Sequence, residues 1–583
     1  MSTGELLETP PDDTSTASDE EGTPAPSPSR KRTSRRHLLL APALAMATTA
    51  CTREEVERFF AAIGKPLPGT NPPTPPAPAP PPATSPPPTT PPPPPEPTDV
   101  TAALAVDKLT FGPKPGLVEA VQAMGVQAWI DRQLAPAGLP DAEGLLASPD
   151  FATLRNTNLA NLGVLQDKGE DRLCDELDHA TLLRAVRSER QLYEVMCDFW
   201  ANHFNIWRHH SYIGFMRIRD NEDVIRPNAL GKFRDMLLAS AHSPAMLDYL
   251  DNLPSDASTP GGVNQNYARE LMELHTLGII NGEHVYTEDD VQAVAMVLSG
   301  WSIRWEEDDP QRFTFEFHPY QHTDQAVSAF GGAFTAPAHP DHEGYDDGVR
   351  LLTFLANHPS TARYIAYKLC RRFIADNPPM NVVESAAAVF TANDTAIAPT
   401  LRHIFRTPEF AASGRRKVRR PLEHLTACCR ALGASVPTNP QGNAAYAMRR
   451  ALEDMGQPIF ERVSPDGYPD VAPYWVSSEG LLKRWGVSGK IARNKLTWYK
   501  ESDKLTVDLV ALLPNPLPAT VGDLVVWMAQ NLGNFTMPPA DVADLCTSIA
   551  VPSSGAAATL SGNASKLALA AGLVLSHPTF QRR

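Results

Sequence analysis

The sequence predicts a mainly α-helical protein: a large multi-helix globular domain with one small β-hairpin, preceded by a disordered tail, an export signal and a proline-rich stalk. Three observations predict this class. Apolar residues recur every three or four positions over most of residues 100–583, alternating strand patterns are few, and 19 of the 57 prolines lie within residues 66–97. Hydrophobic residues make up 42% of the 583-residue chain, which is enough for a sizeable core.

The region before the helical domain has the composition of a delivery segment. Basic residues from Arg30 to Arg36 precede a short apolar run, Leu38 to Ala50, which is shorter than the ~20 residues of a membrane-spanning helix. The Ser34–Leu39 stretch resembles a twin-arginine export signal. The predicted parts are a disordered acidic and then basic tail (1–36), a signal core ending in a lipidation cysteine (37–51), a proline-rich linker (52–99) and a helical globular domain (100–583).

Two processing outcomes remain open for the signal. Residues Thr48 to Cys51 resemble a lipoprotein box with Cys51 as the lipidated residue, whereas Ala45 to Ala47 suit an ordinary signal peptidase. The proline-rich run would extend roughly 100 Å as polyproline II, at about 3.1 Å per residue. Because a stalk is useful behind an anchor, lipidation is favoured. We therefore expect an exported protein of the cell envelope, on the periplasmic or surface face of a membrane, attached through its signal or a lipid.

Charge and cysteine spacing exclude several classes of function. The net charge is −15 and the isoelectric point is near 5.5, which argues against nucleic-acid binding. The seven cysteines form no CxxC pair, so a zinc knuckle or a thioredoxin-like motif is absent. Nothing in the sequence identifies a protein partner.

Helical periodicity can be followed along the domain. The stretch 117–134 carries apolar residues at helical spacing, and 349–374 is predicted as two helices separated at Asn357-His358-Pro359, with the proline starting the second. Phenylalanines alternate in 312–317, and VSAFGGAF (327–334) follows, so one short hairpin is expected there. Residues 463–475 are rich in Pro and Gly and predict an irregular loop.

The string NQNYARELMELHTLG (264–278) predicts a helix that is apolar on most sides. At 100° per residue, Arg269, Glu270 and Glu273 share a narrow polar stripe, and Arg269 and Glu273 are spaced to pair along the helix. One interpretation is an ion-pair network that fixes helix packing. The other is a site in which Glu270 and Glu273, assisted by Arg269, act as catalytic acid/base groups or ligands.

Two histidines are predicted on apolar helix faces. His275 lies opposite the glutamate stripe, and His203 lies in the centre of the apolar face of 192–207. A buried imidazole must hydrogen-bond or bind a metal through its ring nitrogens. Both residues are candidate ligands of a metal ion, the one cofactor the sequence suggests, and both are also compatible with ordinary core positions. The spacing matches neither a zincin pair nor a Glu-x-x-His motif.

Several strings together resemble a known bacterial family, the domain of unknown function 1800 (DUF1800). They are FWANHF (199–204), IRPNALGKFRDMLLASAHSPAMLDYLDN (225–252), NQNYARELMELHTLG (264–278), YTEDDV (286–291), LSGW (298–301) and MGQPIF (455–460). The resemblance implies an exported, mainly helical protein with no established reaction. The family's usual Asn-Glu-Asn is Asn264-Gln265-Asn266 here, and its usual His-Asp-x-Gly-x-Lys lacks the lysine, since Val327 ends that stretch.

These observations lead to two hypotheses of different class. The first is a metal- or carboxylate-dependent envelope enzyme with Arg269, Glu270 and Glu273 as catalytic groups and His203 and His275 as metal ligands. The second is a non-catalytic scaffold for surface binding or assembly, in which the same polar residues only hold helices together.

Overall fold

A computed structural model describes residues 100–140, 143–167, 172–210, 213–280, 284–341, 343–499 and 502–583. The predicted tail (1–36), signal (37–51), lipidation site Cys51 and linker (52–99) lie outside these residues. Within the described ranges, no helix is both long enough and apolar enough to cross a bilayer.

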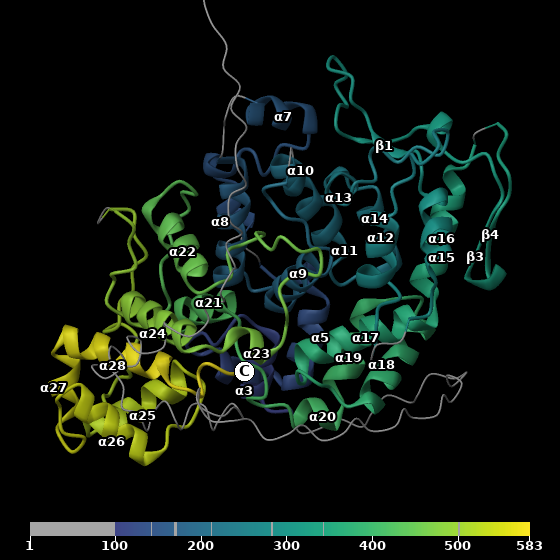
Figure 1. Cartoon of the computed structure of the whole chain (residues 1–583). Helices are drawn as coiled ribbons and strands as arrows, with labels where there is room; N and C mark the ends of the chain where they lie inside the picture. Colours follow the sequence, from purple (N-terminus) through teal and green to yellow (C-terminus); the bar gives the residue numbers. More distant parts are fainter. Residues whose placement is uncertain are drawn as a thin grey trace, which may run out of the picture. The chain divides into compact units, whose positions relative to one another are not determined.

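Helices dominate the described chain, so the predicted mainly α class is confirmed (Figure 1). The helices of the first half are α3 (Ala102–Leu109), α4 (Leu117–Met124), α5 (Val126–Leu134), α6 (Glu143–Leu146), α7 (Leu159–Asp167), α8 (Arg172–Arg187), α9 (Gln191–His203), α10 (Ile213–Arg219), α11 (Arg226–Asn228), α12 (Phe233–Ala241), α13 (Pro244–Tyr249), α14 (Asn266–Glu270) and α15 (Glu288–Val297). Two π-helical segments extend helices of this half, Asp220–Ile225 after α10 and Leu271–His275 after α14.

The second half continues in the same way. Its helices are α16 (Tyr345–Asn357), α17 (Pro359–Phe373), α18 (Met380–Ala392), α19 (Ile397–Phe405), α20 (Pro408–Ala411), α21 (Pro421–Ala431), α22 (Asn443–Asp454), α23 (Ala472–Trp475), α24 (Ser478–Ala492), α25 (Val521–Asn531), α26 (Pro539–Ser548), α27 (Ala557–Ser561) and α28 (Ala564–Ser576). Short 3₁₀ turns lie at Pro136–Gly138, Pro149–Phe151, Pro319–Gln321 and Phe330–Gly332.

The helix boundary predicted at residues 357–359 is confirmed. Helix α16 ends at Asn357, and α17 begins at Pro359 with His358 as its N-cap, whose ring nitrogen accepts a hydrogen bond from Ser360 N at 3.2 Å. The periodic stretch 117–134 forms two helices, because Gly125 adopts φ +87 between α4 and α5. Such a backbone conformation favours glycine and ends a helix locally.

The β structure differs from the single predicted hairpin. Strand β2 (Phe315–Phe317) pairs antiparallel with β1 (Trp301–Ile303), while β3 (Val327–Ala329) and β4 (Phe334–Ala336) form a hairpin of their own. All three residues of β1 are buried, so this strand lacks the alternation by which a half-exposed strand is recognised. The β3–β4 hairpin lies beside α15 and α16 (Figure 1).

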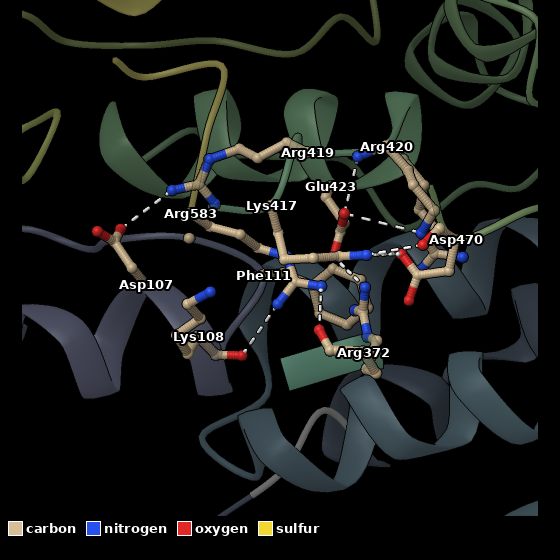
Figure 2. A network of polar contacts seen from close by, with 12 residues as sticks. Asp107, Lys108, Phe111, Arg372, Lys417, Arg419, Arg420, Glu423, Asp470 and Arg583 are labelled. Atoms are coloured by element: carbon tan, nitrogen blue, oxygen red, sulfur yellow. Dashed lines mark hydrogen bonds and ion pairs between the residues drawn. The ribbon is translucent and has the colours of Figure 1, made fainter. Parts of the chain in front are cut away.

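The C-terminal residues pack against the interior. The backbones of Lys417 and Arg583 exchange hydrogen bonds at 3.2 and 2.9 Å, and Arg419 N donates to Gln581 O at 2.8 Å. Arg583 is 1% exposed, and its guanidinium lies 3.0 Å from a carboxylate oxygen of Glu423 in α21. Segments far apart in sequence thus meet at one buried network (Figure 2).

This network contains several fully buried charges. Glu423 also pairs with Arg372 at 2.6 Å, Lys417 pairs with Asp376 at 2.7 Å, and Arg419 donates to Asp107 at 3.0 Å. Burial alone would raise the pKa of Glu423, but Arg372, Arg583 and Arg420 hold it well below its usual value. Paired charges of this kind fix the geometry of the helices that carry them, because removing one partner leaves the other buried and uncompensated.

Candidate functional site

The helix predicted at 264–278 is present and its apolar side faces the core. It consists of α14 and the π-helical segment Leu271–His275, and its buried residues include Tyr267, Leu271, Met272 and His275. Glycine 278, at φ +70, ends the segment by donating its N–H to Met272 O at 3.0 Å. π-Helical segments are uncommon and occur frequently at functional sites.

Arg269 pairs with a neighbouring helix rather than with Glu273. Its two terminal nitrogens donate to the carboxylate of Glu288 at 2.7 and 2.8 Å. Glu288 lies in the first turn of α15, where a capping box between Thr287 and Asp290 fixes the helix start next to Arg269. The two side chains are 36% and 75% exposed, so solvent screens this pair and it stabilises the fold only weakly.

Glu270 and Glu273 are both half-buried at the surface edge of this helix. Burial, and next the negative charge of Glu273, raises the pKa of Glu270 above its usual value. Glu273 also influences the ionisation of Tyr286 and Tyr364, so both hydroxyls lie within electrostatic reach of it. The two glutamates therefore lie in neither bulk water nor a closed ion-pair network.

His203, at the end of α9, is hydrogen-bonded through both ring nitrogens. Lys368 Nζ donates to Nδ1 at 2.8 Å, and Nε2 lies 3.1 Å from the backbone carbonyl of His275. Because an ammonium only donates and a carbonyl only accepts, the neutral imidazole must carry its proton on Nε2. Burial, and next the charge of Lys368, lowers the pKa of His203 well below its usual value, so the ring stays neutral.

His275 is also buried, with its ring centre 6.0 Å from that of His203. Burial, followed by the charge of Lys368, lowers its pKa to about 3. Among the described residues, its Nε2 has no hydrogen-bond partner. The structure thus brings the two predicted histidines together, connected through a backbone carbonyl and facing the same lysine.

Lys368, in α17, is the member of this site that sequence reasoning missed. Burial, and next Arg371, lowers its pKa to about 8, while Asp466 and Asp470 act in the opposite direction. Its Nζ lies 5.4 Å from the ring centre of Tyr364, one helical turn before it. The Tyr364–Lys368 spacing was the available signal, because residues four apart share a helix face. A half-buried lysine with such a pKa can exchange protons near neutral pH.

Tyr364 connects α17 to the glutamate helix. Gly278 lies directly against its ring, and a Cβ at that position would come within 2.2 Å of the aromatic carbons. Only glycine permits both this close approach and the positive φ. The contact, together with the hydrogen bond from His203 to the carbonyl of His275, holds Lys368 and the Glu270–Glu273 edge in a fixed relation.

Residues 463–471 are irregular as predicted, whereas the last four residues of the predicted loop, Ala472–Trp475, form helix α23. The irregular segment 461–471 covers the polar side of α9. Asn202 donates to Tyr468 O at 2.9 Å and accepts from Tyr468 N at 2.7 Å, while Asn205 donates to the carbonyls of Arg462 and Ser464, both at 2.9 Å. This arrangement brings Asp466 into the electrostatic environment of Glu270, Tyr364 and Lys368. The site therefore combines carboxylates, a lysine and tyrosine hydroxyls from four separate segments.

Comparison with known proteins identifies the family. The model of the family described as "Protein of unknown function (DUF1800)" matches residues 104–582. The chain belongs to the DUF1800 family. No curated protein and no solved structure matches it. The DUF1800 description assigns no reaction, so the chemistry of the site must be argued from its own residues.

The two positions at which this DUF1800 chain departs from the expected strings differ in their surroundings. Gln265, in place of the usual glutamate, is the N-cap residue of α14 and is half-buried. Val327, in place of the usual lysine, is buried in β3 and packs into the core. Arg269, Glu270, Glu273, His203 and His275 belong to strings that are intact.

The residues of this DUF1800 site do not fit a metal ion in the arrangement described. A ligating His203 would need a free ring nitrogen, and its Nδ1 already accepts from Lys368. Among the described residues, no group of three or more His, Cys, Asp or Glu side chains is placed to hold a metal. The role of His203 and His275 as metal ligands stays a prediction.

A small cavity lies behind the same helix α9. It has a volume of about 50 Å³ and is lined by polar groups that include Asn202, Asn221 and Arg226, together with Gln457 and Phe460 of the MGQPIF string. Arg226 binds Glu194 through two hydrogen bonds of 2.8 and 3.1 Å. Such a volume holds a few water molecules rather than a substrate. This cavity therefore contributes to the support of α9 and not to the chemistry.

Proposed function

We propose that this protein is an exported cell-envelope enzyme that uses carboxylate and lysine side chains for acid–base catalysis. The observation that carries the proposal is the placement of Lys368. Its ammonium is held by His203 at 2.8 Å, it is half-buried, and it adjoins Tyr364, which is within electrostatic reach of Glu273. A positioned proton donor beside ionisable oxygens is the usual arrangement for general acid–base catalysis.

Each side chain has a separate role in this proposal. His203 orients the Lys368 ammonium by accepting one of its three N–H groups, which leaves the other two for a substrate. Glu270 and Glu273 supply carboxylates, and burial, followed by the charge of Glu273, raises the pKa of Glu270 and favours retention of a proton on it. Tyr364 supplies a hydroxyl that Glu273 influences electrostatically. A substrate would be polar and would approach the half-exposed edge of α14.

The location forms part of the same proposal. The twin-arginine-like Ser34–Leu39 stretch supports export, and Cys51 followed by the proline-rich linker supports a lipid anchor with a stalk. Replacement of Arg35 and Arg36 by Lys should leave the precursor in the cytoplasm, as measured by cell fractionation. Cys51→Ala should remove incorporation of a labelled fatty acid. Unchanged export in the first variant and unchanged labelling in the second would each contradict the corresponding part of the proposal.

Catalysis can be tested with the full chain and polymers or small molecules extracted from a bacterial envelope. We expect turnover of at least one fraction by the wild type and a loss of about 10²–10⁴-fold in Lys368→Met and Glu273→Gln. Lys114→Met is the matched control, because Lys114 is an exposed lysine on a distant part of the sequence. Equal turnover by Lys368→Met, or loss in the control as well, would contradict the assignment.

A non-catalytic scaffold is the second candidate function. The observation in its favour is that Arg269, one of the three predicted catalytic residues, is engaged by Glu288. In a scaffold, the polar edge of α14 would serve to hold α14 and α15 together. The two functions are distinguished by whether substitutions at Glu270 and Lys368 reduce turnover or stability.

A further inference from the structure

A second cavity, polar and larger than the one behind α9, lies between α8, α22 and Trp498. It has a volume of about 280 Å³, close to the lower end of the range of about 300–1,000 Å³ for small-molecule sites. Helix α8 contributes Asp175 and Asp178, α22 contributes residues between Tyr446 and Glu453, and Trp498 follows α24. The segment Pro458–Ile459 lines this cavity on one side and the α9 cavity on the other.

Asp178 is a buried carboxylate, and one of its two oxygens makes no hydrogen bond to a described residue. It is 1% exposed, and its Oδ2 accepts a hydrogen bond from Arg208 Nη1. Within the described ranges, its Oδ1 has no hydrogen-bond partner although it is buried. Burial raises the pKa of Asp178 to about 7, against the opposing charge of Arg208. A ligand group that donates a hydrogen bond to Oδ1 would satisfy this buried acceptor.

One arginine on the same cavity also has an unused donor. Arg208 Nε is buried and makes no hydrogen bond to any described residue, whereas Arg449 Nη2 lies 3.2 Å from a carboxylate oxygen of Asp175. Arg449 Nη1 is held by Pro440 O at 3.0 Å, and its guanidinium stacks on Tyr446 with 4.6 Å to the ring centre. These contacts fix both guanidinium groups before a ligand arrives, which lowers the entropic cost of binding.

The exposed indole of Trp498 lines the cavity. Trp498 is 54% exposed, yet its backbone is fixed because its N–H donates to Asn443 Oδ1 at 2.7 Å. Exposed tryptophans on a fixed backbone offer a large apolar face at little entropic cost, as they do in many binding surfaces. The cavity thus combines one aromatic face with an unsatisfied donor on Arg208 and an unsatisfied acceptor on Asp178.

The balance of charge selects among ligand classes. Three arginines and four carboxylates line the cavity: Arg208, Arg449, Arg450, Asp175, Asp178, Glu453 and Glu461. An anion would meet the carboxylates, and a cation would meet the arginines, so either would be opposed by like charges. A neutral molecule rich in hydroxyl groups, with one apolar face, matches the donor, the acceptor and the indole together.

We propose that this cavity is a binding site for a neutral sugar unit, with the ring stacked on Trp498 and its hydroxyls bonded to Asp178 and Arg208. The site shares no residue with the Lys368 site, so either assignment can fail without the other. For an envelope protein, it would attach the domain to a glycan while the other site is free to act.

The test uses the full chain and titrations with glucose, galactose, mannose, N-acetylglucosamine and their disaccharides, followed by tryptophan fluorescence. We expect a saturable change for at least one neutral sugar, with a dissociation constant on the order of 1 mM or tighter. Trp498→Ala should weaken binding by about tenfold or more, and Asp178→Asn should weaken it while leaving the fold intact. Trp305→Ala, another exposed tryptophan, is the control and should bind as the wild type does.

Three results would overturn the proposal. The first is no saturable response to any sugar of the panel. The second is a response that Trp498→Ala leaves unchanged. The third is saturable binding of inorganic phosphate alone, which would show that the arginines form an anion site. A melting curve of each variant establishes that the lost binding is not lost folding.

Discussion

Two lysines of this protein show how burial separates a structural group from a reactive one. Lys108 of α3 is fully buried in the network of Figure 2, and its Nζ donates to the carbonyl of Ile374 at 3.5 Å. Lys368 of α17 is half-buried and donates to His203 at 2.8 Å. Burial lowers the pKa of both, that of Lys108 well below its usual value and that of Lys368 to about 8.

The surroundings of the two lysines explain the difference. Around Lys108, the neighbouring charges are mostly positive, namely Arg583, Lys417 and Arg415, and only Asp107 opposes them. Around Lys368, the positive charge of Arg371 is opposed by Asp466 and Asp470 on the loop that covers α9. Burial among mostly positive charges favours the neutral amine of Lys108, whereas Lys368, with two opposing carboxylates and partial exposure, can change its protonation during a reaction.

The largest expected effect concerns the charges that hold the buried network together. Glu423→Gln should lower the free energy of unfolding by about 3–5 kcal/mol, because Arg372 and Arg583 would stay buried without their common partner. Urea unfolding followed by circular dichroism measures this change in the free energy of unfolding. The control is Glu384→Gln, whose pair with Arg363 is exposed, with an expected loss of at most about 1 kcal/mol. Similar losses for both would contradict a structural role for the network.

The next largest effect distinguishes Lys108 from Lys417, a buried lysine that is paired with two carboxylates. Because the pKa of Lys108 is lowered on folding, the unfolded chain holds a proton that the folded chain lacks, and stability rises with pH up to about 10.4, by up to about 1.4 kcal/mol per pH unit. Lys108→Met should remove this slope and stabilise the protein at pH 7. Lys417→Met should destabilise it, since Asp376 and Asp470 lose their partner.

Unfolding curves of the two lysine variants between pH 6 and pH 9 check these expectations, with the wild type measured in parallel. A stability gain for Lys108→Met that shrinks as the pH rises agrees with a neutral buried lysine. If Lys108→Met is destabilising at every pH, the amine has an ionic partner and the comparison with Lys368 fails.

The smallest expected effect is at Glu270. A carboxyl whose pKa is raised on folding destabilises the folded protein once the pH rises through that raised pKa. Glu270→Gln should therefore leave the stability of the protein unchanged or slightly higher at pH 7, and it should have no effect in acid. A scaffold role predicts instead a loss of about 1–3 kcal/mol, as for a broken buried hydrogen-bond network. Thermal unfolding of the wild type and the variant at pH 4 and pH 7 distinguishes the two.

Local signals in the sequence predicted local structure. The proline after His358 predicted the start of α17, and the apolar spacing of 264–278 predicted which side of that helix is buried. Helix periodicity depends on neighbours three and four positions away, so it can be read from one segment. The fully buried strand β1 has no such alternation, and its pairing with β2 depends on contacts between separate segments.

The site was predicted only in part for the same reason. His203, His275, Glu270 and Glu273 were named because each stands out within its own helix. Lys368 and the loop around Asp466 come from segments that α9 brings together through His203, Asn202 and Asn205. Asp178 stood out even less, because an aspartate in a helix is usually exposed, and only the fold reveals that one of its oxygens is left without a partner.

The central claim, that Lys368 belongs to a reactive site, can be tested directly by measuring its titration. Limited acylation of the folded full chain at a series of pH values, followed by peptide mass spectrometry, gives the midpoint at which this amine becomes reactive. We expect a midpoint near pH 8, because the pKa of Lys368 is lowered to about 8. A midpoint near about 10.4, as in an ordinary exposed lysine, or no reaction until the chain unfolds, would contradict it.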